Sequence, residues 1–185
     1  MSRLTRDQVL DKIKAGESLA GLDLSEIDLS YESLKGIDMA GSNLQNARLQ
    51  NSNFEGANLS RANLSGAFMF GCNLYNANLD NAECSETNLQ DSNLENASLK
   101  NANLYHAALL GSNMNNADLS GSTLERARMK RSSLRRAKLD DADLQSAHLV
   151  RSDLTNASLK NANLENTTFT NAITDGADFT GAKGR

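Results

Sequence analysis

The sequence predicts an all-β fold, a parallel β-helix with square coils, from a five-residue period, the residues that recur at it and a complete lack of proline. From Leu19 in steps of five to Phe179, 31 of 33 positions are Leu, Met or Phe, and only Cys84 and Thr174 depart. An α-helix has 3.6 residues per turn and does not produce this period. Proline lacks the N–H that an interior ladder needs, and the 185 residues contain none.

A second column of the repeat holds small residues. Two residues before each large one, all 28 positions from Ser42 to Ala177 are Ala, Ser, Thr or Cys. The residue between them is mostly Asn, Asp or Ser, and the next two are mostly polar or Gly, as in Ala-Asn-Leu-Ser-Gly at 62–66. Each pentad therefore points two side chains inward and three outward.

Four such steps complete a square coil of 20 residues. Coils that pair through their backbones stack at about 4.8 Å, so the repeats give about eight coils and a rod of roughly 40 Å. The large residues then stack along the axis, and the small ones allow the backbones to approach.

The first steps depart from this pattern, because Leu22, Ile27 and Ile37 replace small residues and Glu17 and Glu32 stand where Ala is expected. The register is therefore least certain in this part of the repeat.

A short helix is predicted ahead of the repeats, from about residue 6 to residue 15, ended by Gly16. Thr5 and Gln8 have the spacing of a capping box, and Leu4 and Val9 that of a hydrophobic staple. The helix is expected to cover the open edge of the first coil. The apolar residues expected on that edge are Val9, Leu10 and Ile13.

The repeat resembles the pentapeptide-repeat family, whose pattern is A(N/D)LXX, over residues 17–182. This resemblance implies a right-handed quadrilateral β-helix, and the right hand agrees with the general preference of parallel crossover connections. We divide the chain into a capping helix at 1–16, the repeat β-helix at 17–182 and a C-terminal tail at 183–185.

The beginning of the chain is charged and has no signal-peptide-like apolar run, and no stretch approaches the ~18 apolar residues of a membrane span. We expect a cytoplasmic protein with no membrane partner. Cys72 and Cys84 are too few for a disulfide framework and lack zinc-site spacing, so both are interpreted as buried, reduced thiols.

No enzyme is predicted, because no loop interrupts the repeat and a regular rod offers no pocket. We expect no catalytic residue, cofactor or metal. His106 and His148 are assigned to different faces by the 20-residue register. The groups interpreted as solvated surface are Asp140, Asp141, Asp143, His106 and His148.

Residues 20 apart lie on one face, which sorts the outward positions. Three faces are nearly uniform in Asn, Asp and Ser, whereas the fourth, built on Leu29 and its successors, mixes apolar and basic residues. Such mixtures are typical of interfaces, although surface apolar residues also align by chance. The candidate interaction residues are Arg48, Phe68, Phe70, Ala108, Leu110, Arg128, Lys130, Arg131, His148, Val150 and Arg151.

Charge is unevenly distributed: residues 17–120 carry a net −9 and residues 121–185 a net +3. The basic cluster lacks an aromatic platform or groove for nucleic acid, so we interpret it as solvated charge or as a contact with an acidic protein. Its members are Arg126, Arg128, Lys130, Arg131, Arg135, Arg136 and Lys138.

Two functions remain open. The first is a non-catalytic protein-interaction module that docks a partner through its flat faces. The alternative, implied by the resemblance, is a DNA-mimic inhibitor or protector of DNA gyrase or topoisomerase of the quinolone-resistance type. Mimicry needs a continuous acidic surface, which the basic cluster interrupts. An ice-binding rod is disfavoured because the outward columns are rich in Asn rather than Thr.

The C-terminal coil has no recognisable cap. Phe169, Ile173 and Phe179 enlarge it, and two such ends meeting about a two-fold axis would cover both open edges, as dimers of the resembled family do. The candidate partner is thus a second copy through this coil, unless the tail folds over the end.

Overall fold

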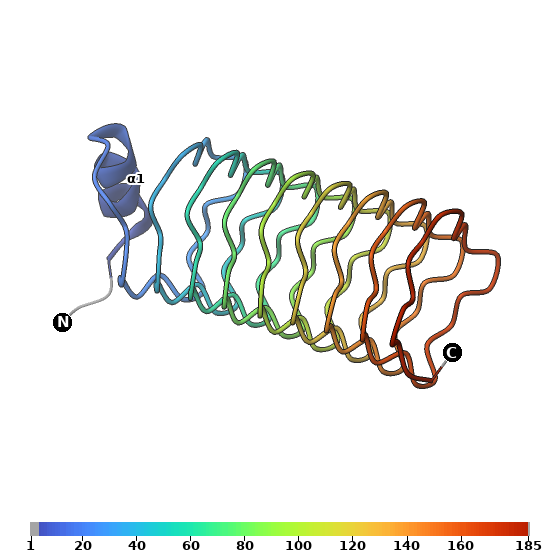
Figure 1. The fold of residues 1–185 in the computed structure, drawn as a ribbon. Coiled ribbons are helices and arrows are strands. Elements are labelled where there is room, and N and C mark those ends of the chain that lie inside the picture. Colours follow the sequence, from blue (N-terminus) through green and yellow to red (C-terminus); the bar gives the residue numbers. More distant parts are fainter. Residues whose placement is uncertain (1–3, 185) are drawn as a thin grey trace.

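The computed structural model describes residues 4–184 as a rod, with helix α1 (Arg6–Lys14) at one end and stacked square coils after it (Figure 1). No strand in this range exceeds a single bridging residue. All 29 bridges are parallel and join residues 20 apart, from Asp23↔Asn43 to Asn163↔Lys183. The coil therefore has 20 residues, and the fold is the expected right-handed quadrilateral β-helix.

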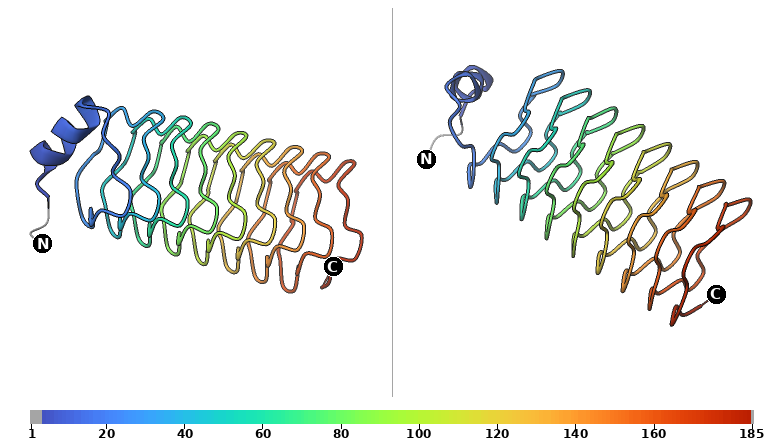
Figure 2. Two further views of the ribbon diagram at one scale, coloured as in Figure 1. Left: turned by 60° about the vertical axis from the view of Figure 1, so that its left-hand side comes forward. Right: turned by 45° about the horizontal axis from the view of Figure 1, so that its top comes forward.

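Each coil is hydrogen-bonded to the coil before it and the coil after it. The N–H of Leu104 donates to the carbonyl of Thr123 in the next coil at 2.7 Å, and the N–H of Asn103 donates to Ala82 in the previous coil at 2.9 Å. The same two bonds recur at every face, so the N–H groups of both residues are satisfied without long strands. The successive coils of the chain lie side by side in both views of Figure 2.

Every corner of the square is a tight turn with one residue of positive φ. At one such corner the N–H of Ala107 donates to the carbonyl of Leu104 at 3.1 Å, and His106, just before Ala107, has φ 59°. Positive φ recurs every five residues from Gly16 to Gly181, at 11 glycines and 23 other residues. Positive φ at the third residue of a β-turn is the type II pattern, which favours Gly and Asn.

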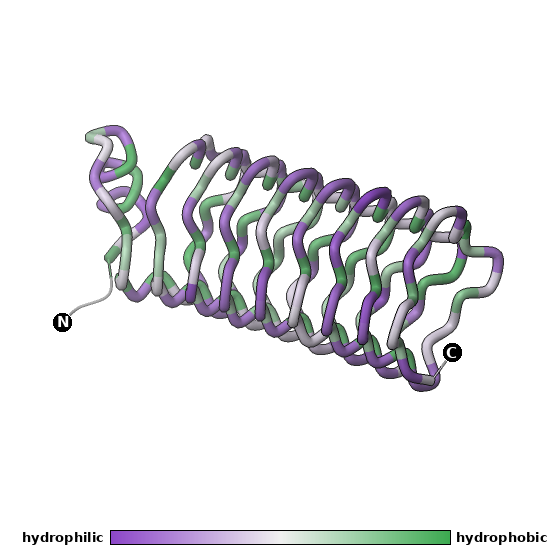
Figure 3. Tube along the Cα trace, in the orientation of Figure 1, coloured by the Kyte–Doolittle hydropathy of each residue, from purple (hydrophilic) through white to green (hydrophobic). Residues whose placement is uncertain are grey.

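The core is a stack of large side chains beside a stack of small ones. Every large position from Leu19 to Leu164 is at most 1% exposed. The buried hydroxyls in the small column bond to carbonyls of large residues, as Ser42 Oγ does to Met39 at 2.8 Å and Ser52 Oγ to Leu29 at 2.7 Å. Apolar and polar residues alternate around each coil (Figure 3).

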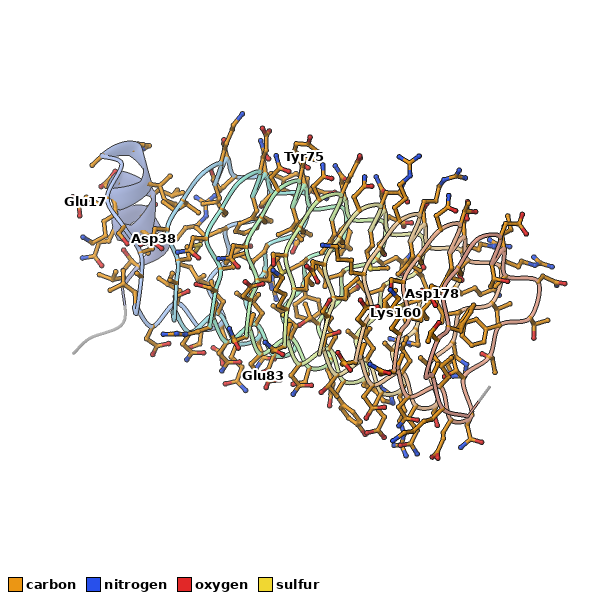
Figure 4. All side chains as sticks on the ribbon, in the orientation of Figure 1. Glu17, Asp38, Tyr75, Glu83, Lys160 and Asp178 are labelled. Atoms are coloured by element: carbon orange, nitrogen blue, oxygen red, sulfur yellow. The ribbon has the colours of Figure 1, made fainter. Side chains whose placement is uncertain are left out.

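The outward Asn residues bond within the rod on three faces. Asn63 accepts from the N–H of Ser65 at 3.1 Å through Oδ1, and its Nδ2 donates to Asn43 in the preceding coil at 3.2 Å. One side chain thus supports its own turn and ties two coils together. Figure 4 shows the outward side chains along the rod, with Tyr75 and Glu83 on opposite sides.

Helix α1 begins and ends as predicted. The Thr5 and Gln8 capping box is present, Ala15 is the C-cap and Gly16 follows with φ 69°. Val9 is fully buried, and Leu10 and Ile13 pack against the core. Among the described residues no helix has the length and apolar character needed to cross a membrane.

Arg6 fastens the helix to the first coil. Its Nε donates to the carbonyl of Asp28 at 2.8 Å, and its guanidinium pairs with Glu32 at 2.6 Å. In later coils the equivalent carbonyl accepts an N–H from the coil below, so Arg6 supplies the bond that a preceding coil would make. Glu32, which breaks the repeat pattern, is explained by this contact.

The repeat holds its register at both ends. Leu19 donates to the carbonyl of Asp38 at 2.8 Å, and Ile27 and Ile37 stay buried although they replace small residues. At the other end Lys183 bridges Asn163. The ladder therefore runs one residue past the expected boundary at 182, and the described part of the tail extends the ladder instead of folding over the end. Arg185 lies outside the described residues.

A pair of neighbouring substitutions tests the inward and outward assignment. Leu89→Asp buries an unpaired carboxylate in the stack and should lower the free energy of unfolding by about 4 kcal/mol or more. Asn88→Asp keeps the acceptor that binds the N–H of Gln90 and should change it by less than about 0.5 kcal/mol. Urea unfolding followed by circular dichroism measures both, and equal effects would contradict the assignment.

Candidate functional site

The structure gathers the predicted interaction residues on one side of the rod, here called the interaction face. Its central column is joined by consecutive bridges, running from Asp28 to Thr168. Phe70, Leu110, Lys130 and Val150 come two residues after members of this column. The bridged residues are Asp28, Arg48, Phe68, Asn88, Ala108, Arg128, His148 and Thr168.

The aromatic part of the interaction face is in the third coil. Phe68 is 47% exposed and Phe70 41% exposed. They line a hollow together with Arg48 and Gln50. Within residues 4–184, Gln50 Oε1 is the buried side-chain oxygen that lacks a hydrogen-bond partner. An unpaired buried acceptor is uncommon in native proteins, and here it lies in the hollow that carries the exposed phenyl rings.

Tyr31 is a further exposed aromatic residue that the sequence prediction missed. It is 74% exposed and occupies the corner of this face in the first complete coil. Tyr31 is separated from Arg131 and Arg151 by multiples of 20 residues, so the register already placed it in the same corner column as these two candidate residues. Of the four exposed large apolar residues in the described chain, three lie on this face; Ile173 is the fourth.

The expected line of exposed apolar groups along the whole face is wrong in one place. Ala108 is only 7% exposed, because its single methyl group lies between the longer side chains of its bridge partners Asn88 and Arg128. Leu110 and Val150 are half-buried. Apolar exposure on this face is therefore concentrated near Phe68 and Phe70.

Four cations in the sixth and seventh coils of this face have no acidic partner. All four are exposed, and none forms a salt bridge within the described residues. Three other members of the predicted basic cluster are paired: Arg135 with Asp153 at 2.9 Å, Lys138 with Asp118 at 3.8 Å and Arg126 with Glu125 at 3.5 Å, whereas Arg136 forms no salt bridge in the described chain. The unpaired cations are Arg128, Lys130, Arg131 and Arg151.

Backbone strain is concentrated in the same region. Ten of the positive-φ residues are not Gly, Asn or Asp, and six of these fall between His106 and Arg151. Arg131 and Arg151 have φ of 60° and 58°. Each such residue costs about 1 kcal/mol relative to a relaxed backbone. Strained residues gather at functional sites, and here the strain places guanidinium groups on a corner.

The two histidines line one hollow, which corrects their assignment to different faces. His106 and His148 share it with Arg126, Arg128 and two polar residues. The reason is that position 106 is a corner, which borders the interaction face as well as the face before it. His148 Nδ1 lies 3.2 Å from Thr168 Oγ1. The remaining lining residues are Ser146 and Asn166.

The other groups named from the sequence lie as follows. Cys72 and Cys84 are free and buried, and burial raises the pKa of each thiol to about 12. Asp140, Asp141 and Asp143 accept hydrogen bonds from the next coil, for example from Asn161 to Asp141 at 3.2 Å. Among the described residues, no three His, Cys, Asp or Glu side chains are grouped to hold a metal ion.

The predicted C-terminal residues also come together. The rings of Phe169 and Phe179 meet edge to face, with centroids 6.2 Å apart, and Ile173 is 49% exposed. In this last described coil the N–H groups of Asn171 and Gly176 donate no hydrogen bond to a described residue.

Comparison with known proteins matches the repeats along most of the chain. The family model described as pentapeptide repeats matches residues 18–56, 37–76 and 147–183, and one described as a pentapeptide repeat region matches residues 67–139. None of the curated proteins compared with the chain matches it.

Several solved structures are similar. HetL, a pentapeptide repeat protein involved in heterocyst differentiation regulation from the cyanobacterium Nostoc sp. strain PCC 7120, is 28% identical, with 99% of each chain covered and a TM-score of 0.37. QnrB1, a plasmid-mediated fluoroquinolone resistance protein, is 18% identical over 84% of this chain and 92% of its own, with a TM-score of 0.35. Rfr23 from the cyanobacterium Cyanothece 51142 is 20% identical over 92% and 96%, with a TM-score of 0.23.

Replacing a strained corner arginine should stabilise the rod. Arg131→Asn places a residue that tolerates positive φ at the corner and should raise the free energy of unfolding by about 0.5–1 kcal/mol. Lys130→Asn removes the same charge next to it without changing a positive-φ residue, and serves as the control. If urea unfolding showed equal gains for both variants, charge rather than backbone strain would be the cause.

Proposed function

The chain belongs to the pentapeptide-repeat family, and from this premise we propose that it is a non-catalytic scaffold that docks an acidic protein partner through the interaction face. One observation carries the proposal. Three of the four exposed large apolar residues, and five of the eight described Lys and Arg residues that form no salt bridge, lie on a single side of the rod, whereas the Asn and Asp columns of the other sides bond among themselves.

Aromatic and arginine residues make this face suitable as the centre of an interface. Tyr, Trp and Arg dominate the binding energy of protein interfaces, and Phe is enriched in them. Phe68 and Phe70 supply the apolar contact, and Arg48 lies in the same hollow. A donor that a partner brings into this hollow would satisfy Gln50 Oε1.

The charge of the face selects the partner. Arg128, Lys130, Arg131 and Arg151 lack acidic partners in the described chain, so an acidic surface laid along the rod would complement them. Electrostatic complementarity of this kind speeds encounter and excludes basic competitors. The distance between the aromatic hollow in the third coil and these cations in the sixth and seventh coils requires a partner that extends along the rod axis.

The regular backbone supports the same role. Each coil is bonded to both neighbours, so the face is held in one shape before a partner arrives, which reduces the ordering cost of binding. The two free thiols are compatible with the reducing cytoplasm, where we place the protein.

The DNA-mimic alternative receives less support from the charges. A mimic needs a continuous acidic surface, and arginines at 126, 128, 131, 135 and 136 interrupt it. The acidic residues of the preceding coils are spread over several faces and partly neutralised, as Lys35 pairs with Glu55 at 2.9 Å and Lys100 with Asp118 at 3.5 Å.

Capture of proteins from the native host tests the docking face. Tagged wild type should recover a partner that Phe68→Ser/Phe70→Ser loses, because the apolar anchors are gone. Tyr75→Ser/Tyr105→Ser removes two aromatic rings from other faces and should retain the partner. Melting curves confirm that both variants are folded. Recovery of the same proteins by all three chains would overturn the proposal.

We also propose that the 185-residue chain associates through its C-terminal coil. The C-terminal coil presents an apolar end made of Phe169, Phe179 and the half-exposed Ile173. The N–H groups of Asn171 and Gly176, which donate to no described residue, offer an edge for pairing. A two-fold arrangement of two such ends buries both.

Light scattering decides whether this association occurs. The wild type should have the mass of a dimer, and Ile173→Lys should have the mass of a monomer because it places charge in the contact. Tyr31→Lys, a matched change at the other end of the rod, should remain dimeric. A monomeric wild type contradicts the association, and a dimer that survives Ile173→Lys contradicts this location.

A further inference from the structure

A hollow rich in hydrogen-bond donors lies on the edge between the interaction face and the face before it. It belongs to four successive coils, with Arg126 and Arg128 in one coil and Ser146 and His148 in the next. His106 and Asn166 line it from the coils on either side. We propose that this hollow binds a phosphate group, either as inorganic phosphate or as the terminal phosphate of a small monoester.

The charge of the hollow fits an oxoanion. Neither guanidinium can lose its charge at physiological pH, and none of the six lining residues is acidic. Arg128 has no salt bridge in the described chain. Arg126 has one acidic neighbour, Glu125, whose carboxylate is 3.5 Å from Nε. This pair is exposed and weak, so it leaves a net positive hollow.

The donors fit a phosphate better than a carboxylate. Arg126 uses one terminal nitrogen to donate to the hydroxyl of Tyr105 at 3.2 Å, which holds the side chain over the corner and leaves its other terminal nitrogen unbonded. His148 lies within hydrogen-bond distance of Thr168 through Nδ1, so its Nε2 can donate to an anion when that nitrogen carries a proton. Two guanidiniums and a hydroxyl in adjacent coils, about 4.8 Å apart, offer more donors than two carboxylate oxygens accept. Arginine forks match phosphate oxygens well.

The backbone of the hollow has strained residues at three consecutive corners. Arg126, His106 and Ser146 are three consecutive members of one corner column, and all three have positive φ, at 57°, 59° and 58°. Asn occupies this corner in the coils at 46 and 166, so the fold accommodates a better-suited residue there. The chain instead carries strained donors where they line the hollow.

Nuclear magnetic resonance of the histidine side chains tests the site in the unmodified protein. The chain has two histidines, and both line the hollow. Titration with inorganic phosphate, at constant ionic strength in chloride, should shift both sets of imidazole resonances along one saturating curve, with a dissociation constant in the millimolar range. Shifts that never saturate, or that chloride reproduces, would overturn the site.

Matched double variants separate a built site from general positive charge. Arg126→Gln/Arg128→Gln should weaken phosphate binding by about tenfold or more, because each of the two substitutions removes a charged donor from the hollow. Lys130→Gln/Arg131→Gln removes the same charge from the same coil, again with one residue at a positive-φ corner, and should weaken it less than about twofold. Equal weakening by both pairs would overturn the proposal. Melting curves show whether each variant is folded, and the unmodified titration stands if one is not.

Parallel titrations identify the source of the phosphate. Phosphoserine that binds as well as inorganic phosphate supports a monoester ligand, and inorganic phosphate alone supports a free anion. If a single-stranded oligonucleotide binds and neither small probe does, the hollow is part of a nucleic-acid surface, and the proposal is overturned. This inference does not rest on protein docking: Phe68→Ser/Phe70→Ser should leave phosphate binding unchanged.

Discussion

The structure depends on one constraint, the pairing of each backbone position with the position 20 residues away. That pairing requires four corners of equal length, and each corner requires a residue with positive φ. The five-residue period, the buried Leu stack and the small residues beside it all follow, because any other spacing would turn large side chains out of the core. The rod is therefore specified by local turns and non-local hydrogen bonds that agree at every step.

Outward side chains are divided between stabilising the rod and presenting a surface. On three faces, Asn and Asp support their own turns and bond to the neighbouring coil, as Asn63 and Asn73 do. The interaction face has few such bonds, and it carries Phe68, Phe70 and unpaired cations in their place. Arginine residues at the nearby strained corners make the rod less stable than Gly or Asn at the same positions would. This exchange of stability for exposed chemistry is common at functional sites.

The sequence was sufficient to predict the fold, the register and the capping helix, because each rests on a period or on local spacing. Thr5 and Gln8 form their capping box, and residues 20 apart do share a face. Side-chain exposure was predicted less well. Ala108 is covered by its longer bridge partners, and the register alone does not give their conformations. Tyr31 was overlooked although its column was known. The shared hollow of His106 and His148 depends on corner side chains reaching across two faces, which a sorting by faces separates.

The 20-residue coil also limits how such a chain can change length. Insertion of one pentad between Phe68 and Arg128 would move every later residue by a quarter turn, so that Arg128 and His148 would leave the side that carries Phe68 and join another. Insertion of a full coil would preserve each column and only lengthen the distance between the aromatic and basic parts. Duplication in units of four pentads thus spaces two binding regions along a common line, whereas smaller units redistribute them around the circumference.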